Sequence, residues 1–230
     1  MTVRFLGQSG YILKSGGSEL IIDPYLSDIV NRVAGRPRAL PVPLKPEDIH
    51  CDAVICTHDH LDHLDPDTVE KIDAEQLFIT TSGGKEKLAE LKRLNSVSIS
   101  EGEGVKVGAF EITAVFADHT VEAFGVIVKA DGKTFYFSGD TLYNERLFEI
   151  KKYRPDATFI CINGRLGNMN VAEALIVAKE IGAPLNIPNH YDMFLSNSKN
   201  PRLFADFIGG GFIMEFNKEY ALTDGGFREI

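Results

Sequence analysis

The order of the predicted secondary-structure elements constrains the fold of this chain most strongly. A block of strands followed by strand-helix units occurs twice along the sequence. The first block ends near Asp23, and the second covers residues 104–138, with a hairpin at Asp131-Gly132. Each sheet can bury an apolar face on the other while helices cover the outer faces. We therefore expect two sheets stacked between helices, an α/β fold.

Apolar periodicity and turn signals place the individual elements. Strands are expected at 2–6, 11–14, 19–23, 53–56, 77–80, 104–107, 110–116, 123–129, 134–138, 157–162, 185–188 and 212–216. Helices are expected at 66–72, 84–94, 144–151, 171–181 and 204–208. The capping residues Asp65 and Asn170 mark two helix starts. Residues 24–46 are proline-rich and carry no expected element. No Ser- or Pro-rich linker divides the chain, so we expect one domain over residues 1–230.

Composition narrows the classes of partner. The chain has 230 residues, 44% of them hydrophobic, and a net charge of −9, which repels nucleic acid polymers. It has no apolar run long enough to span a membrane, and from its first residues we expect no secretory signal. The three cysteines form no C-x-x-C pair, as is usual for buried thiols in a reducing compartment. We expect a cytoplasmic location and no membrane partner.

The segment Thr57-His58-Asp59-His60-Leu61-Asp62-His63 carries the strongest chemical signal. It lies between the expected strand 53–56 and the helix that follows. In an extended segment, residues i and i+2 point to the same side, so His58 and His60 can hold one ion. The turn into the helix directs Asp62 and His63 toward a second ion. An accidental surface cluster is the alternative, and the small number of histidines, six in all, disfavours it.

Three more candidate metal ligands follow expected strands elsewhere in the chain. His119 follows Val115-Phe116, His190 follows Ile187-Pro188, and Asp140 follows a glycine at the end of the strand 134–138. An acidic residue after a strand is more often a turn or helix cap. Asp140 is interpreted as a metal ligand only because the chain also contains the histidines described above. Imidazole and carboxylate ligands suit zinc and manganese alike.

With these residues in place, the sequence resembles the metallo-β-lactamase superfamily, whose H-x-H-x-D-H motif matches His58, His60, Asp62 and His63. The segments that carry a closer resemblance to the L-ascorbate-6-phosphate lactonase branch are 5–10, 22–24, 57–63, 138–140 and 187–192. The resemblance implies a four-layer αββα sandwich with two divalent metal ions, manganese or zinc. His58, His60 and His119 would hold the first ion, Asp62, His63 and His190 the second, and Asp140 would bridge them.

The function that follows is a metal-dependent hydrolase. A metal-bridging hydroxide would attack a small anionic ester, with a sugar-phosphate lactone favoured, and Asp62 would assist proton transfer. Two alternatives remain open. One is a metal-dependent phosphodiesterase acting on a small nucleotide or phosphodiester, and the other is a metal-bound sensor or interaction protein without turnover.

Two loops are candidates for substrate binding. Residues 24–46 contain Arg32, Arg36, Arg38 and Lys45 against Asp28 alone, so four positive charges minus one leave +3. In residues 163–170, Asn163 and Arg165 lie between a strand end and a helix start, where a phosphate can bind. We expect Arg165 to contact the substrate's phosphate. The alternatives for the loop 24–46 are a lid, plain surface, or a contact between copies of the chain in a homo-oligomer. Plain surface or such a contact is also the alternative for the loop 163–170.

Overall fold

The computed structural model describes residues 1–230 and contains two sheets. The first sheet contains, in spatial order, β14 (Gly226–Glu229), β13 (Glu219–Thr223), β1 (Thr2–Gly7), β2 (Gly10–Ser15), β3 (Ser18–Ile22), β4 (Ala53–Ile55), β5 (Phe78–Thr80) and β6 (Ser96–Ser98). The second contains β12 (Leu185–Asn189), β11 (Ala157–Cys161), β10 (Lys133–Phe137), β9 (Gly125–Ala130), β8 (Phe110–Val115) and β7 (Gly104–Val107).

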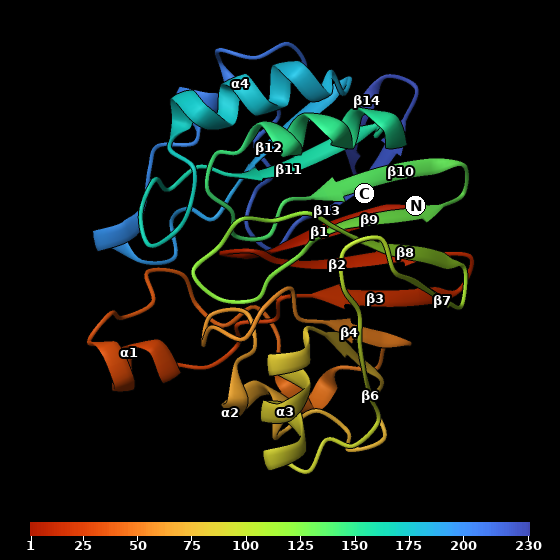
Figure 1. Ribbon diagram of the computed structural model, residues 1–230, viewed down its shortest axis with the longest axis vertical. Helices are drawn as coiled ribbons and strands as arrows, with labels where there is room; N and C mark the ends of the chain where they lie inside the picture. Colours follow the sequence, from red (N-terminus) through yellow and green to blue (C-terminus); the bar gives the residue numbers. More distant parts are fainter.

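The helices lie outside the two sheets. The α-helices are α1 (Ile29–Ala34), α2 (Pro66–Val69), α3 (Ser82–Glu90), α4 (Val171–Ile181) and α5 (Arg202–Ala205). The 3-10 helices are η1 (Pro46–Asp48), η2 (Glu145–Tyr153) and η3 (Leu195–Asn197). Figure 1 shows α4 above the strands and α2 and α3 below them. The arrangement is the expected four-layer α/β sandwich.

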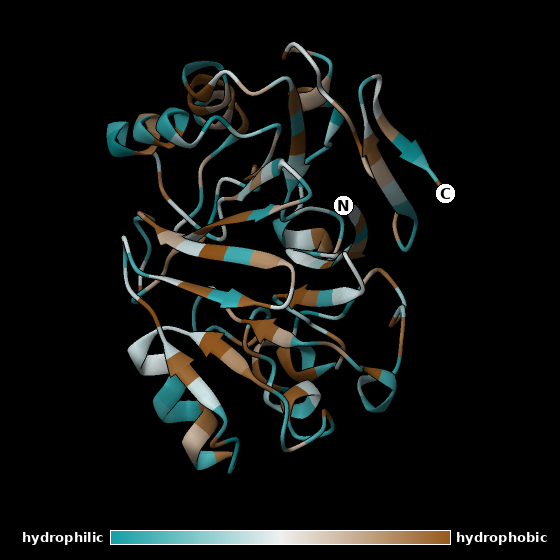
Figure 2. Ribbon diagram, turned by 90° about the vertical axis from the view of Figure 1, so that its right-hand side faces the viewer, coloured by the Kyte–Doolittle hydropathy of each residue, from teal (hydrophilic) through white to brown (hydrophobic).

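Side-chain alternation along the central strands explains the layering. Ala53 and Ile55 of β4 belong to a core cluster of 41 buried residues that fills the space between the sheets and continues beneath α4. Val54, between them, faces the other way and packs in a second cluster that includes Val69 of α2 and Leu88 of α3. Because both faces of β4 are buried, all three of its residues are apolar. Figure 2 shows brown, hydrophobic residues along much of the strands in the middle of the molecule, with some teal residues among them. No helix is long and apolar enough to cross a membrane.

Strand direction brings the site loops to one edge of the sandwich. In the first sheet, β1, β3 and β4 run the same way, since β2 is antiparallel to its two neighbours and β3 is parallel to β4. In the second sheet, β8 and β10 run the same way because β9 is antiparallel to both, and β11 and β12 are parallel to β10. Every candidate ligand follows the end of one of these strands.

Several expected elements differ in the structure. The segment 24–46 contains α1, and the expected helix 66–72 is the shorter α2, whereas residues 145–153 form a 3-10 helix in place of an α-helix. Residues 212–216 form no strand. Phe212 instead packs edge-to-face against Tyr220 and at a tilt against Phe227, so this apolar run packs against the core as a loop. The sequence does not predict the strands β6, β13 and β14. β6 and β14 are short strands at the two edges of the first sheet, and β13 lies between β14 and β1. All three have few buried residues and therefore a weak apolar pattern.

Candidate dinuclear metal centre

The first cluster consists of His58, His60 and His119. The distance from His60 Nδ1 to His58 Nε2 is 3.1 Å, and the distance from His60 Nδ1 to His119 Nε2 is 3.2 Å. The first two residues come from the loop after β4, and His119 comes from the loop after β8 in the other sheet. Two nitrogens of a tetrahedral zinc site lie about 3.3 Å apart when each bond is near 2.0 Å. The spacing therefore fits three imidazoles around one ion.

The second cluster consists of Asp62, His63 and His190, whose ligand atoms lie within 4.8 Å of one another. His63 Nε2 is 3.9 Å from Asp62 Oδ2, and His190 Nε2 is 3.5 Å from the same oxygen. His63 is fully buried and His190 nearly so. The cluster joins the loop after β4 to the end of β12, so it too connects the two sheets.

Asp140 lies between the two clusters. Its Oδ1 is 3.3 Å from both His63 Nε2 and His190 Nε2, and its Oδ2 is 3.9 Å from His119 Nε2. Gly139 precedes it with φ +56°, and a Cβ there would lie 3.2 Å from the Thr57 Cβ. Glycine therefore lets the end of β10 approach the loop after β4 closely enough for the carboxylate to face both clusters.

The residues present fit a pair of divalent metal ions. His63 Nε2 and Asp140 Oδ1 are buried and have no hydrogen-bond partner in the protein. Buried polar atoms are nearly always paired, so two unpartnered atoms facing each other indicate a shared cation. The donors are imidazole nitrogen and carboxylate oxygen, the set that zinc and manganese accept. No cysteine belongs to any of these groups.

Comparison with known proteins agrees with this geometry. The family model described as "Beta-lactamase superfamily domain" matches residues 19–191. The chain belongs to the metallo-β-lactamase superfamily.

Proteins of similar sequence are named metal-dependent hydrolases. The "UPF0173 metal-dependent hydrolase" of Oenococcus oeni is 26% identical over 96% of this chain and 99% of that protein. Among solved structures, the metallo hydrolase Igni18 of Ignicoccus hospitalis has a TM-score of 0.77 at 21% identity, over 95% of this chain and 96% of that one. An isothiocyanate hydrolase from Delia radicum gut bacteria has a TM-score of 0.80 at 18% identity, over 96% and 98% of the two chains. This superfamily member is a metal-dependent hydrolase of the metallo-β-lactamase fold.

Groups outside the two clusters orient the candidate metal ligands through hydrogen bonds. Asp23 Oδ2 lies 2.7 Å from His63 Nδ1, and the carboxylate also accepts hydrogen bonds from the Thr57 amide and hydroxyl. His119 Nδ1 lies 3.0 Å from the Gly167 carbonyl oxygen, which leaves its Nε2 for the first cluster. Such contacts set the tautomer and the orientation of metal-binding imidazoles.

Gln8 joins the second cluster from the turn after β1. Its Nε2 donates to Asp62 Oδ2 at 2.7 Å and lies 2.9 Å from His190 Nε2. Gln8 and His190 both have left-handed backbone conformations, with φ of 56° and 61°, and the His190 amide donates to the Gln8 carbonyl. Non-glycine residues rarely adopt such angles, and they concentrate at functional sites.

The two clusters differ in their electrostatics. Burial, together with the neighbouring imidazoles, lowers the pKa of His58 well below its usual value, so this ring is neutral and able to bind metal. Burial by itself would also lower the pKa of His190. The carboxylates of Asp140 and Asp62 outweigh this effect and raise the pKa of His190 to about 9. Burial would raise the pKa of Asp62, whereas His63 and His190 lower it overall. Asp62 is therefore ionised at neutral pH.

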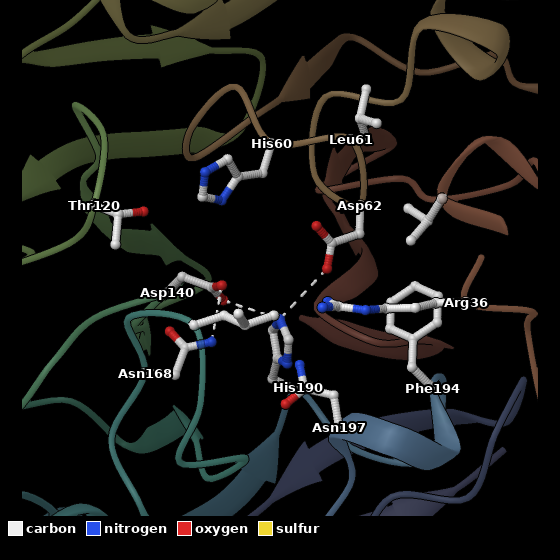
Figure 3. A pocket seen from close by; sticks show the side chains of 12 residues that line it. Arg36, His60, Leu61, Asp62, Thr120, Asp140, Asn168, His190, Phe194 and Asn197 are labelled. Atoms are coloured by element: carbon white, nitrogen blue, oxygen red, sulfur yellow. Dashed lines mark hydrogen bonds and ion pairs between the residues drawn. The ribbon is translucent and has the colours of Figure 1, made fainter. Parts of the chain in front are cut away.

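A cavity of about 370 Å³ opens beside the clusters, as Figure 3 shows. It is lined by Val30, Arg36, His60, Leu61, Asp62, Thr120, Asp140, Leu166, Asn168, His190, Phe194 and Asn197. Asn168 donates from Nδ2 to Asp140 Oδ2 at 2.8 Å and so orients the carboxylate between the clusters. The lining combines apolar side chains with a few polar groups, as is usual in small-molecule sites.

The two residues expected to bind substrate lie outside this lining. Arg165 is exposed, and its guanidinium donates to the Ser196 carbonyl. Asn163 is buried and donates to Asn197 Oδ1, so it adjoins the cavity through that residue. Substrate contacts by Arg165 and Asn163 stay predictions.

Sequence reasoning did not single out four residues that the fold brings to the site: Gln8, Asp23, Arg36 and Asn168. Gln8 and Asp23 lie in segments that carry the family resemblance, Arg36 contributes to the positive charge of the loop 24–46, and Asn168 lies in the candidate loop 163–170. Only the direction of each side chain distinguishes it from its neighbours in the sequence. His50, the one histidine outside the clusters, is exposed.

Proposed function

We propose that the two clusters hold two divalent ions, manganese or zinc, and that the enzyme hydrolyses a small anionic ester, with a sugar-phosphate lactone as the favoured substrate. The observation that carries the proposal is the position of Asp140, which faces both clusters and has a buried, unpartnered oxygen. The cavity of about 370 Å³ suits a small molecule and excludes a polymer from its interior.

The bound metals and the side chains have separate tasks in this proposal. Divalent ions at such a site lower the pKa of water from about 15.7 toward 7 and polarise a carbonyl oxygen. In lactone hydrolysis, water adds to the ring carbonyl carbon, the ring C–O bond breaks, and the proton from water ends on the ring oxygen. Asp62 is placed to take and return this proton, because it is ionised, borders the cavity and is oriented by Gln8.

A small phosphodiester is the second candidate substrate. Divalent ions held by the two clusters would supply positive charge for both the attacking and the leaving oxygen of a displacement at phosphorus. The arrangement of Asp140 between the clusters supports this reaction equally well. Because the cavity is small, the phosphodiester would be a dinucleotide or a cyclic nucleotide at most.

The test is an activity panel on defined metal forms. The protein would be stripped with a chelator, reloaded separately with manganese and zinc, and assayed against lactones, phosphodiesters, thioesters and β-lactams. Turnover of lactones that disappears in Asp140→Ala and persists in the surface variant His50→Ala supports the proposal. Turnover of phosphodiesters alone supports the second candidate, and tight metal binding without turnover of any compound contradicts both.

A further inference from the structure

The cavity beside the metal clusters contains one positively charged side chain that belongs to neither cluster. His60, Asp62, Asp140 and His190 account for the other ionisable residues of its lining. Arg36 is the fifth, and it comes from the loop that follows α1. Figure 3 shows its guanidinium extending into the cavity toward Asp62 and His190.

The other two arginines of the segment 24–46 are already engaged in contacts within the chain. Arg32 forms an ion pair with Asp67 on α2. Arg38 donates to the carbonyl oxygens of Tyr25, Ser27, Leu40 and Pro41, and its guanidinium lies 4.6 Å from the centre of the Tyr25 ring. Arg36, by contrast, is half-buried and forms no hydrogen bond or ion pair with the protein. Its five N–H donors are therefore free for a ligand.

The backbone on both sides of Arg36 is well constrained. Gly35 ends α1 in a left-handed conformation, with φ of 65°, and donates from its amide to the Asn31 carbonyl at 2.8 Å. Pro37 restricts the residue before it to extended conformations, and Arg38 then ties the chain to the segment 25–27. The side chain is thus presented from a fixed backbone, which lowers the entropy lost when a ligand binds.

Charge indicates the kind of ligand. Two divalent ions would bring four positive charges to the clusters against the two negative charges of Asp62 and Asp140. A free guanidinium beside such a centre adds to the repulsion unless an anion binds between them. A planar guanidinium pairs with a phosphate or a carboxylate through two parallel hydrogen bonds.

We propose that Arg36 anchors the oxyanion of the substrate, a phosphate or carboxylate group, while the ester carbonyl lies at the metal clusters. This inference rests on the proposed function and assigns the anion contact to Arg36 in place of Arg165. The carbon skeleton between the two ends packs on Val30, Leu61 and Phe194. Val30 and Phe194 already belong to one buried cluster with Tyr25, so this apolar wall is packed before a ligand binds.

The test compares Arg36→Ala, Arg36→Lys, Arg165→Ala and the surface control Arg32→Ala. Each would be assayed on three lactones with the same ring: one phosphorylated, one carboxylated and one uncharged. Arg36→Ala should raise KM for the charged lactones by about 10- to 100-fold, the usual loss for a charge-assisted contact, and leave kcat nearly unchanged. Arg36→Lys should recover part of the loss, and the uncharged lactone should be hydrolysed as in the wild type. The phosphorylated and carboxylated lactones distinguish the two oxyanions.

A binding measurement separates this inference from the proposed function. Inorganic phosphate would be titrated into manganese-loaded wild type and Arg36→Ala in a calorimeter, which requires no turnover. Weaker phosphate binding in Arg36→Ala supports the anchor even if every lactone fails as a substrate. Equal phosphate affinity in the two proteins, equal losses on charged and uncharged lactones, or a selective loss in Arg165→Ala alone would overturn it.

Discussion

Asp23 illustrates how one buried side chain can control a metal site that it does not enter. Its carboxylate accepts from the Thr57 amide at 2.7 Å and faces His63 Nδ1, so His63 Nε2 is left to face Asp140. Asp23→Asn keeps the size of the side chain but removes the charge and one acceptor. We expect metal affinity to fall by about 10- to 100-fold, the usual effect of losing such a partner. Competition with a chromophoric chelator would measure it, with the exposed Asp224→Asn as control. Unchanged affinity would contradict the role of Asp23.

The candidate ligands lie on loops outside the apolar core, so their removal should affect metal and activity more than folding. We expect Asp140→Ala and His60→Ala each to abolish turnover and to lower the bound metal, while the far-ultraviolet circular dichroism stays as in the wild type. His50→Ala, which removes an exposed histidine, should retain both metal and activity. Full metal content in Asp140→Ala would exclude Asp140 as a ligand.

Cys51 should be unreactive until high pH. Burial, with smaller contributions from Glu19 and Asp52, raises the pKa of its thiol to about 12. Only the thiolate reacts with iodoacetamide, so in native protein the labelling rate should rise about tenfold per pH unit up to this value. Unfolding in urea should restore reaction near pH 9, where the thiol ordinarily ionises. Cys56 and Cys161 are buried and should not contribute in the native state. A native labelling rate that levels off near pH 9 would contradict this pKa.

The helix α4 depends on a capping box at its start. The Asn170 side chain accepts from the backbone amides of Ala172 and Glu173, and the Glu173 side chain accepts from the Asn170 amide. Asn170→Ala should therefore lower the free energy of unfolding by about 1 kcal/mol in urea titrations. The exposed Glu180→Ala, near the other end of α4, should change it by less than about 0.5 kcal/mol. Equal effects of the two changes would mean that the cap contributes nothing.

Metal binding should stabilise the complete molecule, because the clusters connect loops from both sheets. We expect about two divalent ions per chain by elemental analysis, since seven candidate ligands exceed what one ion uses. At about 100 times the dissociation constant, a bound ligand adds about 2.7 kcal/mol of stability. Removal by a chelator should thus lower Tm by roughly 5–10 °C for a domain of this size. One ion per chain at saturation would contradict the dinuclear site, and an unchanged Tm would contradict the link between the sheets.

Local patterns were enough to predict the layers and the candidate ligands. Periodicity reveals strands and helices, Asn170 and Asp65 act within three residues of themselves, and the histidines from 58 to 63 share one short loop. The strands β13 and β14 are not predicted, because strands with few buried residues have a weak apolar pattern. The contacts that complete the site depend on segments far apart in the chain. His60 meets His119 across 59 positions, and Gln8 meets His190 across 182. Arg36 lines the cavity and Arg165 does not, because the fold brings the segment after α1 beside the clusters and leaves Arg165 exposed. No short-range pattern in the sequence contains that information.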